Sequence, residues 1–131
     1  MAQQVEFTTG ELSRILNEKG SVSLHGILFD TGLAQIKDES KGDLASVGEL
    51  LKQNPALRLE SQGHTDNVGA PDANRRLSEA RAVAVKQYLA SNFGVAADRL
   101  TTSGLGDTTP VADNATDQGK AQNRRVALIK K

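Results

Sequence analysis

Hydrophobic and polar positions follow two different spacings in turn along this chain. Strand-like segments, which are either apolar throughout or alternate between apolar and polar side chains, lie at residues 22–29, 57–62, 99–103 and 125–130. Between them, residues 36–53 and 71–93 carry apolar side chains three and four positions apart, which predicts two amphipathic helices. Strands and helices are therefore expected to alternate along most of the chain.

Turn-forming and capping residues set the limits of these segments. A short helix is expected ahead of the first strand, with Thr8 or Thr9 as its N-cap and Gly20 at its end. The long helix at 71–93 opens on a proline, which suits the first helical turn, and Gly94 follows it as a stop signal. Sequence signals thus mark the ends of the short first helix and of the helix at 71–93.

Two further segments are loops by composition. Residues 63–69 are rich in glycine and polar side chains, and residues 104–123 form a polar stretch in which Asp113 or Asn114 could cap a single helical turn. The complete order is strand, helix, strand, helix, strand, loop, strand. Such an order predicts a sheet covered by helices, which is an α/β or α+β sandwich.

Composition and charge narrow the classes of function. The chain has 131 residues, with 16 Lys and Arg against 16 Asp and Glu, and the isoelectric point is about 6.7. This balance argues against a nucleic-acid partner, which normally requires a basic surplus. The chain contains no cysteine, so disulfides and cysteine-based metal sites are excluded. No apolar run approaches the ~18 residues of a membrane span, and residues 1–4 do not open a signal peptide.

One arginine on the long helix faces the wrong way for a solvent-exposed residue. At about 100° per residue, Leu77, Ala84 and Tyr88 define one apolar stripe. Arg81 projects only about 40° from the centre of that stripe. A buried guanidinium needs an anionic partner, and the nearest candidate along the chain is Asp66. Arg81 therefore extends past the stripe to solvent, pairs structurally with a carboxylate, or binds an anionic ligand.

At this point the sequence resembles the OmpA-like peptidoglycan-binding domain. The resemblance rests on five motifs in order and at family spacing: Phe29-Asp30-Thr31-Gly32, Gly63-His64-Thr65-Asp66-Asn67-x-Gly69, Asn74-x-x-Leu77-Ser78-x-x-Arg81-Ala82-x-x-Val85, Gly104-x-Gly106 followed by Pro110-x-Ala112-x-Asn114-x-Thr116-x-x-Gly119, and Asn123-Arg124-Arg125-Val126. It covers about residues 22–130. The resemblance implies a β-α-β-α-β-β domain at residues 21–131, with a mixed sheet and helices packed on one face. Residues 1–20 are then an N-terminal leader with a short extra helix.

The resemblance also implies a binding module that performs no reaction. Members of this family grip the diaminopimelate of the peptidoglycan stem peptide, whose side chain ends in a free ammonium and a free carboxylate. Carried onto this chain, Asp66 meets the ammonium and Arg81 meets the carboxylate. The implied supporting positions are Asn74, Arg124, Asp30, Thr31 and Gly32. This division of roles is chemically reasonable, because the planar fork of arginine matches a carboxylate with two hydrogen bonds.

Location and partners follow from the same resemblance. We expect a periplasmic domain of a Gram-negative envelope, associated with the outer membrane, that holds its parent protein to the cell wall. No cofactor, metal ion or nucleic acid is expected, and any membrane contact is expected through a part of the parent protein outside these residues. The domain itself is expected to be a monomer or a weak dimer.

Three alternatives compete with this interpretation. Asp30-Thr31-Gly32 after an apolar run resembles the catalytic tripeptide of small homodimeric aspartic proteases, although those enzymes are nearly all-β and the helix at 71–93 disagrees. His64 and Asp66 could be two metal ligands, but no third ligand is suggested by spacing, and a hydrogen bond of His64 within its loop is expected instead. Within the same family, the module also anchors flagellar stator proteins to the wall.

Overall fold

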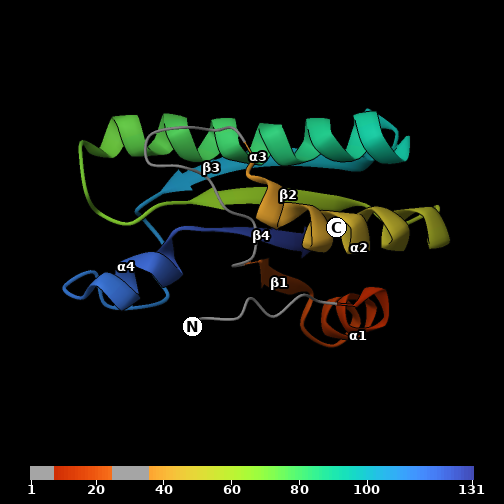
Figure 1. Cartoon of the computed structure of the whole chain (residues 1–131), viewed down its shortest axis with the longest axis horizontal. Coiled ribbons are helices and arrows are strands. Elements are labelled where there is room, and N and C mark those ends of the chain that lie inside the picture. The colour runs from red at the N-terminus through yellow and green to blue at the C-terminus, as the bar shows by residue number, and fades with distance from the viewer. Residues whose placement is uncertain (1–7, 25–35) are drawn as a thin grey trace.

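The computed structural model describes residues 8–24 and 36–131 and forms one layered α/β unit (Figure 1). In chain order the elements are α1 (Thr9–Lys19), β1 (Ser21–Leu24), the 3₁₀ helix η1 (Asp38–Ser40), α2 (Lys41–Gln53), β2 (Leu59–His64), α3 (Pro71–Phe93), the 3₁₀ helix η2 (Ala97–Arg99), β3 (Leu100–Gly106), α4 (Asp117–Asn123) and β4 (Arg125–Lys130).

The four strands form one mixed sheet in the order β1-β4-β2-β3. β2 and β3 are parallel, whereas β4 runs antiparallel to both of its neighbours, β1 and β2. The expected mixed sheet is thus confirmed. One expectation about it is wrong: the basic residues at the C-terminal end predict the exposed face of an edge strand at residues 125–130, whereas β4 lies inside the sheet, between β1 and β2. Alternation of side chains along a strand is the same at an edge and in the centre, so the sequence pattern does not distinguish them.

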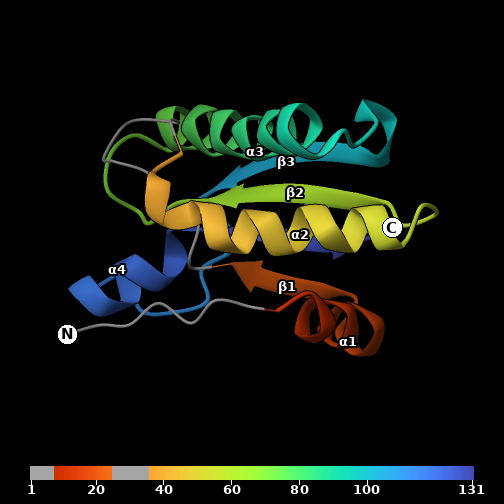
Figure 2. The ribbon, with the colours of Figure 1, turned by 45° about the vertical axis from the view of Figure 1, so that its right-hand side comes forward.

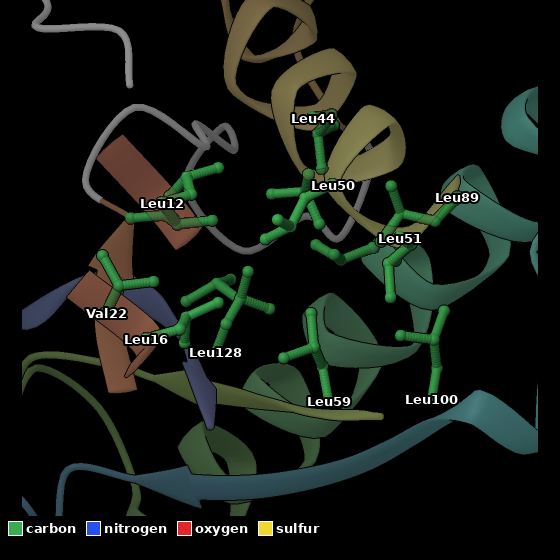
Figure 3. Close-up of a cluster of buried hydrophobic side chains, with 14 of the residues drawn as sticks. Leu12, Leu16, Val22, Leu44, Leu50, Leu51, Leu59, Leu89, Leu100 and Leu128 are labelled. Carbon is green, nitrogen blue, oxygen red and sulfur yellow. The ribbon is translucent and has the colours of Figure 1, made fainter. Parts of the chain in front are cut away.

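Helices α1, α2 and α3 cover the same face of the sheet, as expected, and in Figure 2 α2 crosses in front of the strands, between α3 and α1. The hydrophobic core between the two layers is almost entirely aliphatic. Its largest fully buried side chains are Leu12, Leu24, Leu44, Leu50, Leu51, Leu59, Leu89, Leu100, Leu128, Val47, Val85 and Val126, and many of them are drawn in Figure 3. Helix α1 contributes Leu12 and Leu16 to this core, so residues 9–19 pack with the rest of the domain.

The predicted helix ends agree closely with the structure where a capping signal was clear. The side chain of Thr8 accepts a hydrogen bond from the Glu11 amide at 3.1 Å, Glu11 accepts one from the Thr8 amide at 3.2 Å, and Gly20 ends α1 with a φ of 77°. Helix α3 spans residues 71–93 as predicted and ends at Gly94, which has a φ of 65°.

Other boundaries differ from the prediction. The segment predicted as one helix at 36–53 contains η1 followed by α2, β2 lies two residues further along the chain than predicted, and β3 continues to Gly106. Neither Asp113 nor Asn114 caps α4. The cap is Thr116, whose hydroxyl accepts a hydrogen bond from the Gly119 amide at 2.9 Å, while Asp113 accepts one from the Ala115 amide at 2.8 Å and so holds the preceding turn.

Two glycines allow α3 to lie directly on the sheet. Gly63 of β2 and Gly104 of β3 are neighbours across the parallel pair. A Cβ atom at Gly63 would overlap the backbone carbonyl of Ser78, and one at Gly104 would lie 2.7 Å from the carbonyl oxygen of Arg75. The N-terminal half of α3 therefore packs against strand backbone, which fixes its position relative to the loop that follows β2.

Candidate ligand-binding site

The buried face of α3 carries three polar side chains, Asn74, Ser78 and Arg81. The stripe predicted from Leu77, Ala84 and Tyr88 lies at its margin, where these residues are only partly buried. The fully buried positions are Asn74, Ser78, Arg81, Ala82, Val85 and Leu89. This correction has a packing reason: the close approach of α3 to the glycine pair favours small side chains, namely Ser78 and Ala82, at the centre of the contact. It places Arg81 deeper than predicted, at 6% exposure.

The loop after β2 is held in place by hydrogen bonds within the loop and by hydrogen bonds to β3 and α3. The Thr65 amide donates to the carbonyl of Gly106 at 2.8 Å, and the Thr65 hydroxyl donates to the carbonyl of Asp66 at 2.8 Å. One carboxylate oxygen of Asp66, Oδ1, accepts a hydrogen bond from the Val68 amide at 3.0 Å. Asn74 on α3 donates to the carbonyl of Val68 at 3.0 Å. Asn74 therefore ties the loop to the helix, and the Asp66 carboxylate has a fixed orientation.

The ion pair at this site joins Asp66 to Arg124. Nη1 of Arg124 lies 2.6 Å from Oδ2 of Asp66. The sequence analysis named Asp66 as the nearest candidate partner of Arg81, whereas the ion pair of Asp66 is with an arginine 58 residues further along the chain. The Asp66 side chain is 12% exposed and that of Arg124 is 47% exposed. The pair thus joins a largely enclosed carboxylate to a guanidinium at the surface.

The charges of Asp66 and Arg124 both act on the guanidinium of Arg81. Burial lowers the pKa of Arg81, the positive charge of Arg124 lowers it further, and the negative charge of Asp66 raises it. Among these three residues there are two cations and one anion. The three charged side chains thus lie close enough to influence one another.

Helix α4 and a buried asparagine position Arg124. Asn123 is fully buried, its Oδ1 accepts from the amides of Val111 and Ala112 at 2.8 and 3.0 Å, and its Nδ2 donates to the Ala112 carbonyl and the Asn114 side chain at 3.0 and 2.7 Å. All the hydrogen-bonding groups of this amide are thus engaged. The chain is fixed at the residue before Arg124, and the sequence analysis had assigned Asn123 no role of its own.

His64 and Arg125 lie beside the site and are both buried. They are neighbours across β2 and β4, and they are 2% and 6% exposed. His64 belongs to β2, and its ring nitrogens have no hydrogen-bond partner among residues 8–24 and 36–131, so the expected hydrogen bond within its loop is wrong. Burial, and then the charge of Arg125, lower the pKa of His64 to about 4. Arg125 was expected at an exposed edge, whereas its guanidinium donates to the carbonyls of Asn123 and Thr109 at 3.3 and 3.0 Å.

Four of the seven predicted site residues thus come together in the structure: Asp66, Asn74, Arg81 and Arg124. The other three, Asp30, Thr31 and Gly32, lie outside the described residues. Within residues 8–24 and 36–131 no three His, Asp or Glu side chains gather as a metal site would require. The helices described for this chain are also too short or too polar to cross a bilayer.

A separate pocket lies between α1 and the end of α2. It has a volume of about 410 Å³ and is lined partly by Leu16, Leu50 and Pro55. The cation at its rim, Lys130, already donates to the side chain of Asn17 at 2.8 Å. The described residues of its lining form no cluster of opposite charges comparable to that around Asp66.

Comparison with known proteins shows the family to which this chain belongs. A family model described as the OmpA family matches residues 28–124. The chain is 45% identical over 100 residues to outer membrane protein Omp38 of Acinetobacter baumannii, an alignment that covers 76% of this chain and 28% of Omp38. It is 44% identical over 86 residues to the peptidoglycan-binding protein ArfA of Mycobacterium tuberculosis, which covers 66% of this chain and 26% of ArfA. The chain therefore spans little more than a quarter of the length of these two relatives.

Solved structures share the fold. The peptidoglycan-associated lipoprotein of Burkholderia pseudomallei superimposes with a TM-score of 0.74 at 31% identity, over 87% of this chain and 92% of that one. The cell wall anchor of the T6SS from Pseudomonas aeruginosa gives a TM-score of 0.68 at 28% identity, over 89% and 91% of the two chains. The family match extends over most of the chain and includes Asp66, Asn74, Arg81 and Arg124. This chain belongs to the OmpA family.

Proposed function

We propose that this domain binds peptidoglycan non-covalently through the diaminopimelate of the stem peptide. The observation that carries the proposal is the cluster of one carboxylate and two guanidinium groups at the end of the sheet, where Asp66 meets Arg124 at 2.6 Å and the charges of both act on Arg81. A ligand that carries an ammonium and a carboxylate on one carbon atom complements such a cluster. The diaminopimelate side chain has this structure.

Each half of the ligand has a suitable partner. The ammonium binds the Asp66 carboxylate, whose orientation is fixed by the Val68 amide. The carboxylate binds the guanidinium of Arg81, which presents parallel donors that a lysine does not have. Asn74 supports the loop that carries Asp66, and Arg124 adds a second positive charge. Contacts to Asp30, Thr31 and Gly32 remain a prediction from the family motif.

The relatives support this proposal by their names. One is a peptidoglycan-binding protein, one is a peptidoglycan-associated lipoprotein, and one is a cell wall anchor. Others are outer membrane proteins. We infer that the domain works in the periplasm, where it tethers a longer envelope protein to the wall, either as a monomer or as a weak dimer. Structures of MotB share the fold at 19–21% identity, which shows the fold alone, so an anchor of a flagellar stator stays a prediction from the family motifs.

The protease alternative finds little support. Its motif, Asp30-Thr31-Gly32, lies outside the described residues, and a sheet covered by the 23-residue helix α3 differs from the nearly all-β architecture of that class. Incubation with purified sacculi separates the two functions. We expect no soluble muropeptides above the buffer control, and their release would contradict a pure binding module.

Binding to the same sacculi tests the proposal directly. The wild-type domain should sediment with them, and Asp66→Asn and Arg81→Gln should each reduce sedimentation to background, because each substitution removes one charge and nearly preserves side-chain shape. Arg14→Gln is a matched control, since Arg14 pairs with Glu18 on the exposed face of α1 at 3.3 Å. Sedimentation of either site variant at the wild-type level would contradict the assignment.

A further inference from the structure

The position where a ligand ammonium would meet Asp66 is already filled by a cation of the chain itself. The Oδ1 atom of Asp66 accepts from the Val68 amide, and the Oδ2 atom accepts from Nη1 of Arg124. Among the described residues, each carboxylate oxygen therefore has one donor, and only the donor on Oδ2 belongs to a side chain that can move away.

We propose that Arg124 acts as an internal substitute for the ligand ammonium and that binding is an exchange of one cation for the other on Asp66. This inference rests on the proposed function and assigns Arg124 a specific part in it. The incoming ammonium takes the place of the guanidinium on Oδ2, and Arg124 swings outward to the ligand carboxylate next to that ammonium. No covalent bond changes in the exchange.

The surroundings of the ion pair allow Arg124 to leave Asp66 at a small cost in free energy. The Arg124 side chain is 47% exposed, so it can rotate toward solvent without moving the core. Solvent screens the guanidinium end of the pair, so the pair contributes less to stability than one in which both partners are buried. Arg81 is close enough for the charge of Arg124 to act on it, so outward movement of Arg124 also relieves repulsion between two guanidinium groups. The backbone remains fixed, because Asn123 holds the preceding residue.

Exchange makes Arg124 a residue that determines specificity. A ligand with an ammonium alone, such as a lysine-type stem peptide, displaces Arg124 and leaves it without an anion. A diaminopimelate-type stem peptide displaces it and then supplies a carboxylate to receive it. Displacement of Arg124 thus weakens binding of the lysine-type peptide, whereas the carboxylate of the diaminopimelate-type peptide becomes the new partner of Arg124. Arg81 only adds affinity for the carboxylate.

The test measures the dissociation constants of soluble diaminopimelate-type and lysine-type muropeptides by NMR titration. In Arg124→Gln we expect the lysine-type fragment to bind about two- to fivefold more tightly than in wild type, in line with the small worth of a half-exposed ion pair. The diaminopimelate-type fragment should not gain affinity, because it loses the contact with Arg124. Arg124→Lys should retain weak lysine-type binding, since a cation still covers Asp66. Arg14→Gln, which removes another paired surface arginine, should match wild type for both fragments.

The outcomes separate the two proposals. If Arg124→Gln lowers the affinity for both fragments equally, Arg124 is an ordinary ligand contact, and if it changes neither affinity, Arg124 does not take part in binding. Either result contradicts the exchange, while diaminopimelate recognition by the wild type still stands. If the wild type binds neither fragment, the proposed function fails and the exchange fails with it. Unchanged melting temperatures of the variants would show that the differences arise at the site.

Discussion

Replacement of Gly63 by alanine tests whether the position of α3 on the sheet depends on the glycine pair. The new Cβ would overlap the carbonyl group of Ser78 in the backbone of α3, far inside the 3.0 Å that real Cβ atoms observe. A flexible side chain could rotate away from such an overlap, but helix backbone can only move as a unit. The helix must therefore shift away from β2 or the strand must bend.

The expected penalty follows from the nature of this clash. Overpacking a well-packed contact costs about 1–3 kcal/mol and occasionally more, and the upper part of that range fits a collision with backbone. For a domain of this size, 1 kcal/mol corresponds to roughly 3–6 °C in melting temperature. We therefore expect Gly63→Ala to lower the melting temperature by roughly 5–15 °C. Because Arg81 lies one turn beyond Ser78, affinity for the ligand should also fall.

Thermal unfolding followed by circular dichroism measures this effect, and Gly10→Ala is the matched control. Gly10 lies in the first turn of α1, where a Cβ would meet nothing within 4 Å. Alanine is there a better helix former by up to about 1 kcal/mol, so the control should melt at the same temperature or higher. A Gly63→Ala variant as stable as wild type would refute the close packing of α3 on β2.

Two further predictions concern groups beside the site. Asn123→Ala should lower the free energy of unfolding by about 1–3 kcal/mol in a denaturant titration, because the fully buried Asn123 side chain loses its hydrogen bonds and the partly buried amides of Val111 and Ala112 lose their acceptor; unchanged stability would contradict the role of Asn123. The ring of His64 should stay neutral down to about pH 4, because burial and Arg125 lower its pKa from 6.5. Between about pH 6.5 and 4, His64 is protonated in the unfolded chain but not in the folded one. The free energy of unfolding therefore decreases as the pH falls through this range. NMR titration of the ring checks this, and a midpoint near 6.5 would be inconsistent with the burial described.

The sequence predicted most where a local signal had a single interpretation. Pro71 and Gly94 fix the ends of α3 through backbone preferences that act over one or two residues, and both ends were predicted correctly. The cap of α4 was missed, because the run from Asp113 to Thr116 offers several capping side chains and tertiary packing decides among them. Gly119 lies so close to the carbonyl of Asp113 that a Cβ there would overlap it, which leaves Thr116 as the cap.

The site shows the same division between local and long-range information. Helical periodicity correctly indicated that Arg81 projects inward, since the angle between residues on one helix depends only on their spacing. The same argument could not identify Arg124 as the partner of Asp66, because the two residues are 58 positions apart and meet only when β4 inserts beside β2. The burial of His64 and Arg125 depends on that same strand pairing. Such contacts follow from topology, which spacing along the chain does not contain.

The most direct test of diaminopimelate recognition is calorimetry of the wild-type domain with matched muropeptides. A lysine-type fragment lacks the carboxylate that Arg81 binds, which removes a charged hydrogen bond worth about 1.5–3 kcal/mol. We expect the diaminopimelate-type fragment to bind roughly ten- to a hundredfold more tightly, and amidation of its carboxylate to weaken binding toward the lysine-type value. Equal dissociation constants for the three fragments would mean that Arg81 is a structural arginine and that the proposed recognition is wrong.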